Sequence, residues 1–101
     1  MPPTYPLVRI KELFGKGAFR ITQSALETAG LINCLHDEIV DCVTNHLSES
    51  HFYKTMASET VPGLMQDVYK IRFEDERIYL KLQIKNECAV VVSFKEDEST
   101  G

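Results

Sequence analysis

The chain has 101 residues, of which 44% are hydrophobic and 26% charged, and its formal net charge at pH 7 is -4. A chain of this length buries a core without disulfides or a structural metal, so we expect one domain over residues 1–101, with residues 96–101 as a frayed tail. No apolar run approaches the roughly 18 residues of a membrane span, and the N-terminus lacks the order of a signal peptide, so we expect a cytoplasmic protein without membrane contact.

Helices are predicted in the first half of the chain. Apolar side chains at helical spacing, followed by two glycines, predict a short helix over residues 7–17. Residues 22–30 follow as a second helix, with Thr22 as its N-cap and Gly30 as its C-cap. The third helix covers residues 35–47 and carries acidic residues near its start, where the helix dipole favours them. Its predicted buried face consists of Leu35, Ile39, Val43 and Leu47.

The spacing of the apolar residues then changes from that of a helix to that of a strand. Four strands are predicted, over residues 51–57, 65–73, 77–85 and 89–95. Short turn-forming segments separate them, so consecutive strands are expected to pair antiparallel. The expected fold class is therefore α+β, an antiparallel twisted sheet with the N-terminal helices packed on one face.

Alternation in residues 77–85 predicts which side chains enter the core. The core face of this strand consists of Ile78, Leu80, Leu82 and Ile84. An odd-numbered loop around Asn86 is needed to bring the apolar set of the next strand to the same side. That set consists of Val90, Val92 and Phe94. A two-residue turn within residues 74–76 likewise sends the preceding strand's apolar set inward, namely Met65, Tyr69, Ile71 and Phe73.

The opposite face of the predicted sheet gathers cations although the whole chain is acidic. No Lys or Arg lies between Ile21 and Tyr53, whereas the last third of the chain contains Lys70, Arg72, Arg77, Lys81, Lys85 and Lys95. Cations bind phosphates, a tyrosine ring stacks on bases and an amide binds base edges or sugars, so this face indicates RNA binding. A solvated sheet face is the alternative explanation of the same charges. The residues that alternation places here are Gln66, Lys70, Arg72, Tyr79, Lys81, Ser93 and Lys95.

Four short motifs resemble, in order, those of one toxin family. They are LSESHFYKTM (47–56), MQDVY (65–69), IYLK (78–81) and VSFKE (92–96). Together with KELF and SAL near the N-terminus, they make nearly the whole chain similar to the motility quorum-sensing regulator (MqsR) family of bacterial mRNA interferases, which have a RelE-like fold. The resemblance implies the toxin of a type II toxin–antitoxin system, active in stress response and persistence. It further implies an endoribonuclease that inhibits translation by cleaving single-stranded mRNA at a short, GCU-like sequence, without the ribosome, a metal or another cofactor.

The same resemblance implies a protein partner. This partner is a cognate MqsA-like antitoxin, a zinc-binding, helix-turn-helix protein that inhibits the toxin and represses their shared operon. DNA is then contacted only indirectly, through the antitoxin.

Site residues carry over from the family one position at a time. The resemblance implies catalytic roles for Lys54, Gln66, Tyr79 and Lys95. The remaining polar-face residues, Lys70, Arg72, Lys81 and Ser93, are expected to bind RNA. Periodicity does not place Lys54 on the polar face, because alternation sets it beside Phe52 and Met56. Met65 departs from the family pattern, in which this position often carries an aromatic residue.

Metal-free RNA cleavage needs a deprotonated 2′-hydroxyl, a protonated leaving 5′-oxygen and neutralised phosphorane charge. A lysine serves as the base only if burial or clustering lowers its pKa, and we expect Lys54, Lys81 and Lys95 to cluster in this way. Tyr79 would hold the phosphate or relay a proton. The sequence leaves open which group is the base and which the acid. It also leaves open a second function class, a non-catalytic RNA- or antitoxin-binding module on the same fold.

No metal site is expected. The three cysteines are an odd count without CxxC spacing, which argues against a disulfide framework or a cysteine zinc site. Cys42 and His46 are an i, i+4 pair, but the sequence offers no evident third ligand.

Overall fold

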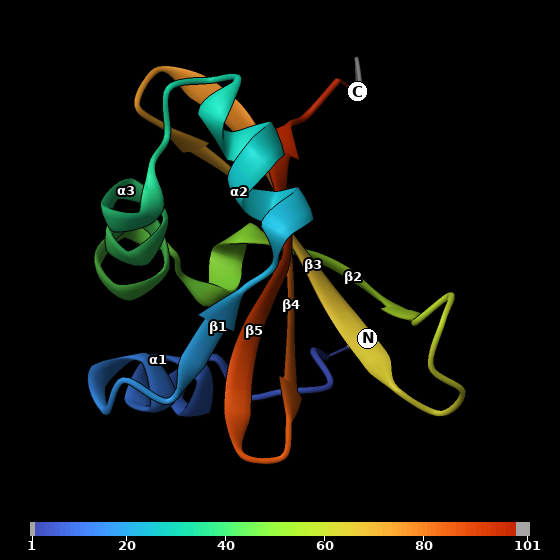
Figure 1. Cartoon of the computed structure of the whole chain (residues 1–101). Coiled ribbons are helices and arrows are strands. Elements are labelled where there is room, and N and C mark those ends of the chain that lie inside the picture. Colours follow the sequence, from blue (N-terminus) through green and yellow to red (C-terminus); the bar gives the residue numbers. More distant parts are fainter. Residues whose placement is uncertain (1, 99–101) are drawn as a thin grey trace.

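The computed structural model describes residues 2–98 as helices packed on a five-stranded sheet (Figure 1). The helices are α1 (Leu7–Gly15), α2 (Gln23–Gly30) and α3 (His36–Asp41). The strands are β1 (Phe19–Ile21), β2 (Phe52–Ala57), β3 (Met65–Phe73), β4 (Glu76–Lys85) and β5 (Cys88–Glu96). A π-helical turn, Cys42–His46, continues α3, and a short 3-10 turn, Glu49–His51, leads into β2. Within residues 2–98, no helix has the length and apolar content needed to cross a membrane.

The predicted α+β class is confirmed, with one addition to the sheet. The strand order is β1-β5-β4-β3-β2, and β2 to β5 pair antiparallel as predicted. β1 was not predicted, and it pairs parallel to β5, so the sheet is mixed rather than fully antiparallel. In Figure 1, α1 and α3 lie on one side of the sheet, and the other side of β3 and β4 carries no helix.

The core lies between the helices and the inward face of the sheet. Its helical side includes Ile39, Val43 and Leu47, and its sheet side includes Leu80, Leu82 and Phe94. Leu35 does not join them, because it precedes the first turn of α3 with an extended backbone and is 66% exposed. The prediction that Leu35 belongs to the buried face is therefore wrong.

Two threonine hydroxyls fasten α2 to β5. Thr22 is the N-cap, as predicted: its Oγ1 accepts a hydrogen bond from the first turn and donates one to the Val92 carbonyl at 3.0 Å. Near the other end of the helix, the Thr28 hydroxyl donates to the Phe94 carbonyl at 2.6 Å. α2 therefore lies along β5 beyond the short pairing with β1.

The β3–β4 hairpin has the predicted two-residue turn. Glu74 and Asp75 have φ angles of 54° and 63°, the left-handed pair typical of such tight hairpins. The apolar set of β3 is accordingly turned inward: Tyr69, Ile71 and Phe73 are buried, and Met65 is half-buried.

The β4–β5 hairpin differs from the prediction. Its loop also has two residues, Asn86 and Glu87, with φ angles of 52° and 58°, so the odd-numbered loop is wrong. A bulge in β5 realigns the strands instead. Lys81 pairs with Ser93, whereas Leu82 pairs with Val91, which leaves one extra residue in β5.

The bulge changes which valines face the core. Val91 is fully buried opposite Leu82, a place predicted for Val90 and Val92. Val90 instead lies opposite Gln83 on the other face, where both side chains are buried. The predicted positions of Val90 and Val92 are therefore wrong, although Phe94 pairs with Leu80 as expected.

β5 extends further than predicted, so the C-terminal tail begins later in the sequence. Glu96 belongs to β5, and the Asp97 amide donates to the Arg77 carbonyl at 2.7 Å, so a tail that is frayed from residue 96 is wrong for these two residues. Residues 99–101 of the predicted tail lie outside the described residues.

Candidate functional site

The sheet face opposite the helices carries the residues that sequence analysis grouped, and we term it the polar face. Across the strands, Lys70 pairs with Tyr79, and Tyr79 pairs with Lys95. One step along, Lys81 pairs with Ser93. Side chains directly opposite on one face of a sheet are neighbours, so the predicted grouping of Tyr79, Lys95 and Lys81 is confirmed. Arg72 also lies on this face, opposite Arg77 and one step beyond Lys70.

Lys54 reaches the polar face through a bulge in β2. Phe52 pairs with Tyr69, but Lys54 pairs with Val68, so Tyr53 is an extra residue between them. The bulge reverses the alternation that set Lys54 on the core side, and that part of the sequence analysis is wrong. Lys54 therefore lies in one row with Val68, Lys81 and Ser93.

Cations surround two tyrosine rings on this face. The ammonium nitrogen of Lys95 lies 5.2 Å from the ring centroid of Tyr79, and that of Lys81 lies 5.9 Å from it. The ammonium nitrogen of Lys70 lies 4.0 Å from the ring centroid of Tyr53, and that of Lys54 lies 5.6 Å away. These distances are in the range of cation–π contacts. The face thus presents phosphate-binding groups next to rings suited to stacking.

Gln66 lies on the polar face but is not open to solvent. It is 8% exposed, and its Nε2 donates to Oε1 of Gln83 at 2.9 Å. The prediction of an open Gln66 is therefore wrong, whereas its catalytic role stays a prediction. Gln83, its partner, lies on the face that alternation gives it but was not among the predicted site residues.

Burial and charge shift the proton affinities of the central residues. Burial lowers the pKa of Lys81, Glu59 opposes this change, and the nearby charges of Lys95 and Lys54 lower the pKa further. The charges of Lys95 and Lys54 thus act on Lys81, as predicted, although burial is the larger cause. Burial also raises the pKa of Tyr79, and its phenol therefore keeps its proton at neutral pH.

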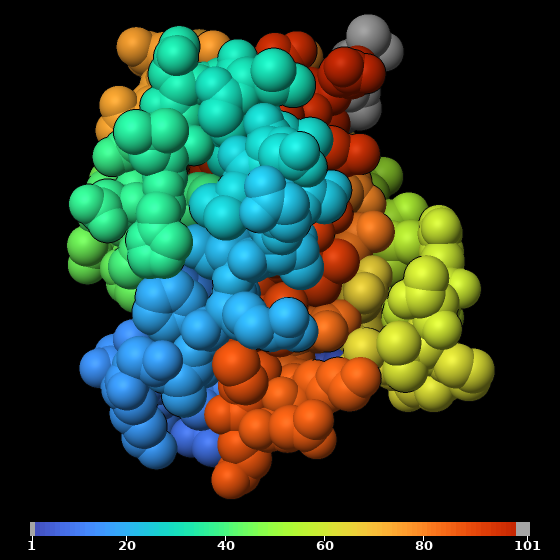
Figure 2. Space-filling model, in the orientation of Figure 1, coloured from blue at the N-terminus to red at the C-terminus, as the bar shows by residue number. Residues whose placement is uncertain are grey.

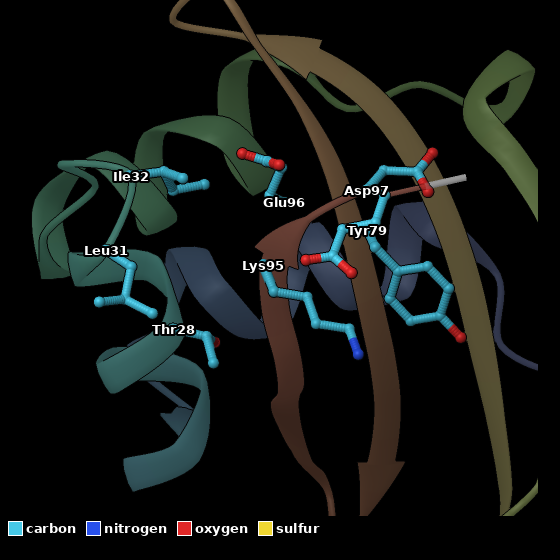
Figure 3. A pocket seen from close by; sticks show the side chains of 8 residues that line it. Thr28, Leu31, Ile32, Tyr79, Lys95, Glu96 and Asp97 are labelled. Atoms are coloured by element: carbon cyan, nitrogen blue, oxygen red, sulfur yellow. The ribbon is translucent and has the colours of Figure 1, made fainter. Parts of the chain in front are cut away.

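A groove opens between α2 and the polar face, and we term it the α2 groove (Figure 3). Its volume is about 530 Å³. Thr28, Leu31 and Ile32 line the helical side, and Tyr79, Lys95, Glu96, Asp97 and Glu98 line the strand side. In Figure 2, parts of β4 and β5 are visible between α2 and the segment of residues 58–64. Tyr79 and Lys95 therefore belong both to the lysine cluster and to the groove.

Comparison with known proteins shows the family to which the chain belongs. A family model described as "Motility quorum-sensing regulator, toxin of MqsA" matches residues 2–96. The chain belongs to the MqsR toxin family. It is 35% identical over 94 residues to a protein of Escherichia coli (strain K12) named mRNA interferase toxin MqsR, with 93% of this chain and 94% of the relative covered.

Two parts of this MqsR-family site escaped sequence analysis. Tyr53 follows Phe52 in the FYK motif and lies on the polar face, where the β2 bulge also brings Lys54. Asp97, expected in the tail, is mostly buried, and its carboxylate lies 3.6 Å from the ammonium of Lys70. Alternation with Phe52 turned to the core would have indicated Tyr53, whereas neither alternation nor composition indicates Asp97.

Candidate metal ligands do not gather within residues 2–98. In the described part of the chain, no group of three or more His, Cys, Asp or Glu side chains is placed to hold a metal ion. Cys42 is buried in the core, and the Nε2 of His46 faces the carboxylate of Asp41 at 3.2 Å.

Proposed function

We propose that this chain is the toxin of a type II toxin–antitoxin pair and an endoribonuclease that cleaves single-stranded mRNA in the cytoplasm, thereby inhibiting translation. The observation that carries the proposal is the row of Lys54 and Lys81, next to the ring of Tyr79, which the ammonium groups of Lys81 and Lys95 approach. The name of the E. coli relative, an mRNA interferase toxin, supports the same activity.

The cluster holds groups suited to each proton transfer. Lys81 is the lysine whose pKa burial lowers, so its neutral amine is the most accessible base for the 2′-hydroxyl. Tyr79, with its raised pKa, keeps its proton and donates to the phosphorane or to the leaving 5′-oxygen. The ammonium groups of Lys54 and Lys95 neutralise the phosphate. This mechanism needs neither a metal ion nor the ribosome.

A single strand is the best match to this face. The bases of an unpaired strand are free to splay out and stack on aromatic rings, and Tyr53 and Tyr79 offer such rings among the cations. A short recognised sequence, GCU-like by resemblance to the family, is part of the proposal. Lys70, Arg72 and Ser93 flank the cluster and hold the RNA backbone.

The partner is a zinc-binding, helix-turn-helix antitoxin. The family description, which calls its members toxins of MqsA, supports this pairing. DNA is contacted only through that partner. β1 and β2 are the edge strands of the sheet that residues 2–98 form, so an antitoxin strand that pairs with either outer edge need not cover the lysine cluster.

The activity is tested with purified protein and an unstructured RNA oligonucleotide in EDTA. Cleavage that leaves a 2′,3′-cyclic phosphate or a 3′-phosphate is expected. Cleavage only after a divalent metal is added would refute the mechanism. Binding without cleavage under all conditions would favour the non-catalytic module.

A further inference from the structure

The polar face continues beyond the lysine cluster along β3 and β4. Every second residue of β4 points to this face, so Lys81 is preceded by Tyr79 and Tyr79 by Arg77. Arg77 pairs with Arg72 of β3, two residues beyond Lys70. Four residues of an extended strand span about 14 Å, so Arg77 lies that far along β4 from Lys81. A phosphate held at Arg77 is therefore not the one that lies over the lysine cluster.

Two arginines stand directly opposite each other at this end of the polar face. Arg72 and Arg77 are both exposed, and they are paired across β3 and β4. Like charges in directly opposed positions of a sheet repel each other and destabilise the pairing. Arg72 forms no ion pair with a carboxylate of residues 2–98. An anionic ligand that contacts both guanidinium groups would remove this repulsion.

A small groove lies at this arginine pair, and we term it the arginine groove. Its lining consists of Lys70, Ile71, Arg72, Arg77, Ile78 and Asp97. Its volume is about 230 Å³, below the roughly 300 Å³ of pockets that hold drug-sized ligands, so it suits a group of the size of a phosphate. The carboxylate of Asp97 is mostly buried and lies 3.6 Å from the ammonium of Lys70. One carboxylate among three cations leaves an excess of positive charge in the lining.

We propose that the arginine groove is a second phosphate-binding subsite, in which Arg72 and Arg77 hold a backbone phosphate of the RNA away from the scissile one. The inference rests on the proposed ribonuclease function. The planar guanidinium of an arginine donates paired hydrogen bonds that match the oxygens of a phosphate. A contact to the backbone raises affinity and fixes the position of the strand, and it does not depend on the identity of the bases. Arg77, which was not among the predicted site residues, is therefore a substrate-binding residue.

The first test measures the affinity of the full chain for an RNA oligonucleotide at several salt concentrations, with 2′-O-methyl groups in the RNA to prevent cleavage. For single strands, each lost phosphate contact lowers the slope of log K against log salt by about 0.7. Arg72→Gln and Arg77→Gln should each lower the slope by about this amount and weaken binding roughly 10-fold at low salt. Arg9→Gln is the matched control. It removes the same charge from α1, on the helix side of the sheet, and should leave the slope unchanged.

A second measurement locates the contact on the RNA. One phosphate at a time is replaced by an uncharged methylphosphonate, and the replacement should weaken binding by wild-type protein at one position away from the cleavage site. In the double variant Arg72→Gln, Arg77→Gln, the same replacement should cause no further loss, because the protein side of that contact is already absent. Replacement of the scissile phosphate should weaken binding equally in wild-type protein and in the double variant.

The outcomes separate the subsite from the activity. If wild-type protein cleaves RNA but the arginine variants keep the slope of Arg9→Gln, the subsite is overturned while the proposed activity stands. The same holds if no phosphate replacement loses its effect in the double variant, or if the variants lose only antitoxin binding. If wild-type protein binds RNA but never cleaves it, the activity is overturned and the salt slopes still decide the subsite. If it binds no RNA, both are overturned. Should the double variant not fold, Arg77→Gln alone decides, because it removes one of the two contacts to the same phosphate.

Discussion

Two tyrosine-to-phenylalanine variants, one on each face of the sheet, distinguish an effect on catalysis from an effect on folding. Tyr79 lies on the polar face, with the ammonium groups of Lys95 and Lys81 at 5.2 and 5.9 Å from its ring centroid. Tyr69, on the neighbouring strand, is fully buried on the core face, and its hydroxyl has no hydrogen-bond partner within residues 2–98. Tyr79→Phe and Tyr69→Phe remove the same atom while keeping the ring.

The two variants are expected to change different quantities, kcat for Tyr79→Phe and stability for Tyr69→Phe. A lost donor to the transition state costs about 2.7–4 kcal/mol, so Tyr79→Phe should lower kcat by roughly 10²- to 10³-fold with little change in KM. Its free energy of unfolding should change by less than about 0.5 kcal/mol, because the half-buried ring remains. Burying an unsatisfied hydroxyl costs about 1–3 kcal/mol, so Tyr69→Phe should leave kcat unchanged and keep or raise the stability.

The assays are single-turnover cleavage of a short RNA and urea unfolding of both variants. Burial raises the pKa of Tyr69 to about 12, so its phenol is un-ionised at any assay pH and the comparison is not confused by its titration. A Tyr79→Phe enzyme with wild-type kcat would remove Tyr79 from the mechanism. A Tyr69→Phe enzyme as slow as Tyr79→Phe would show that the loss arises from the fold and not from the site.

Two further predictions address the lysines and the core. The charge of Glu59 raises the pKa of Lys81, so Glu59→Gln should move the rising limb of the pH profile of kcat/KM to lower pH. A limb that stays in place or moves to higher pH would exclude Lys81 as the base. Glu87→Gln is the control. Leu80→Ala should lower the free energy of unfolding by about 2–5 kcal/mol because Leu80 is fully buried. Lys81→Ala should unfold like wild-type protein, and its affinity for RNA should fall less steeply with salt than that of wild-type protein. Equal thermal midpoints for the two variants would contradict this assignment of faces.

That Tyr79 and Lys95 share a face could be predicted because Leu80 and Phe94 must both enter the core, although a bulge in β5, and not the predicted odd-numbered loop, produces this register. Ile78, Leu80 and Leu82 must enter the core together, and this requirement sends Tyr79 and Lys81 to the other face whatever the turn does. The two-residue turn between β3 and β4 was predicted for the same reason. The burial of apolar side chains determines these features, and the alternation of apolar and polar residues in the sequence shows which side chains are buried.

Other parts of the site depend on geometry that alternation does not record. A bulge adds one residue to one strand, so the side chains beyond it point to the opposite face of the sheet. The alternation of apolar and polar residues on either side of the bulge remains regular and does not reveal this change. Lys54 was placed on the wrong side for this reason. β1 has only three residues, too few to show a strand period, and it forms because β5 offers an edge. The α2 groove depends on where a helix docks, which is a tertiary contact.

The bulge in β5 connects the core with the candidate site. The tight turn at Asn86 and Glu87 pairs Lys85 with Cys88, and this register continues as far as Leu82 and Val91. Carried on without the extra residue, it would place Phe94 opposite Tyr79 on the polar face and turn Lys95 toward the core. The inserted residue reverses both, so that Phe94 is buried against Leu80 while Lys95 meets Tyr79. A charged lysine in the core and an exposed phenylalanine would each be unfavourable, so the requirements of folding keep the bulge in the place where the site needs it. The lysine cluster therefore depends on core packing as much as on the chemistry of its own side chains.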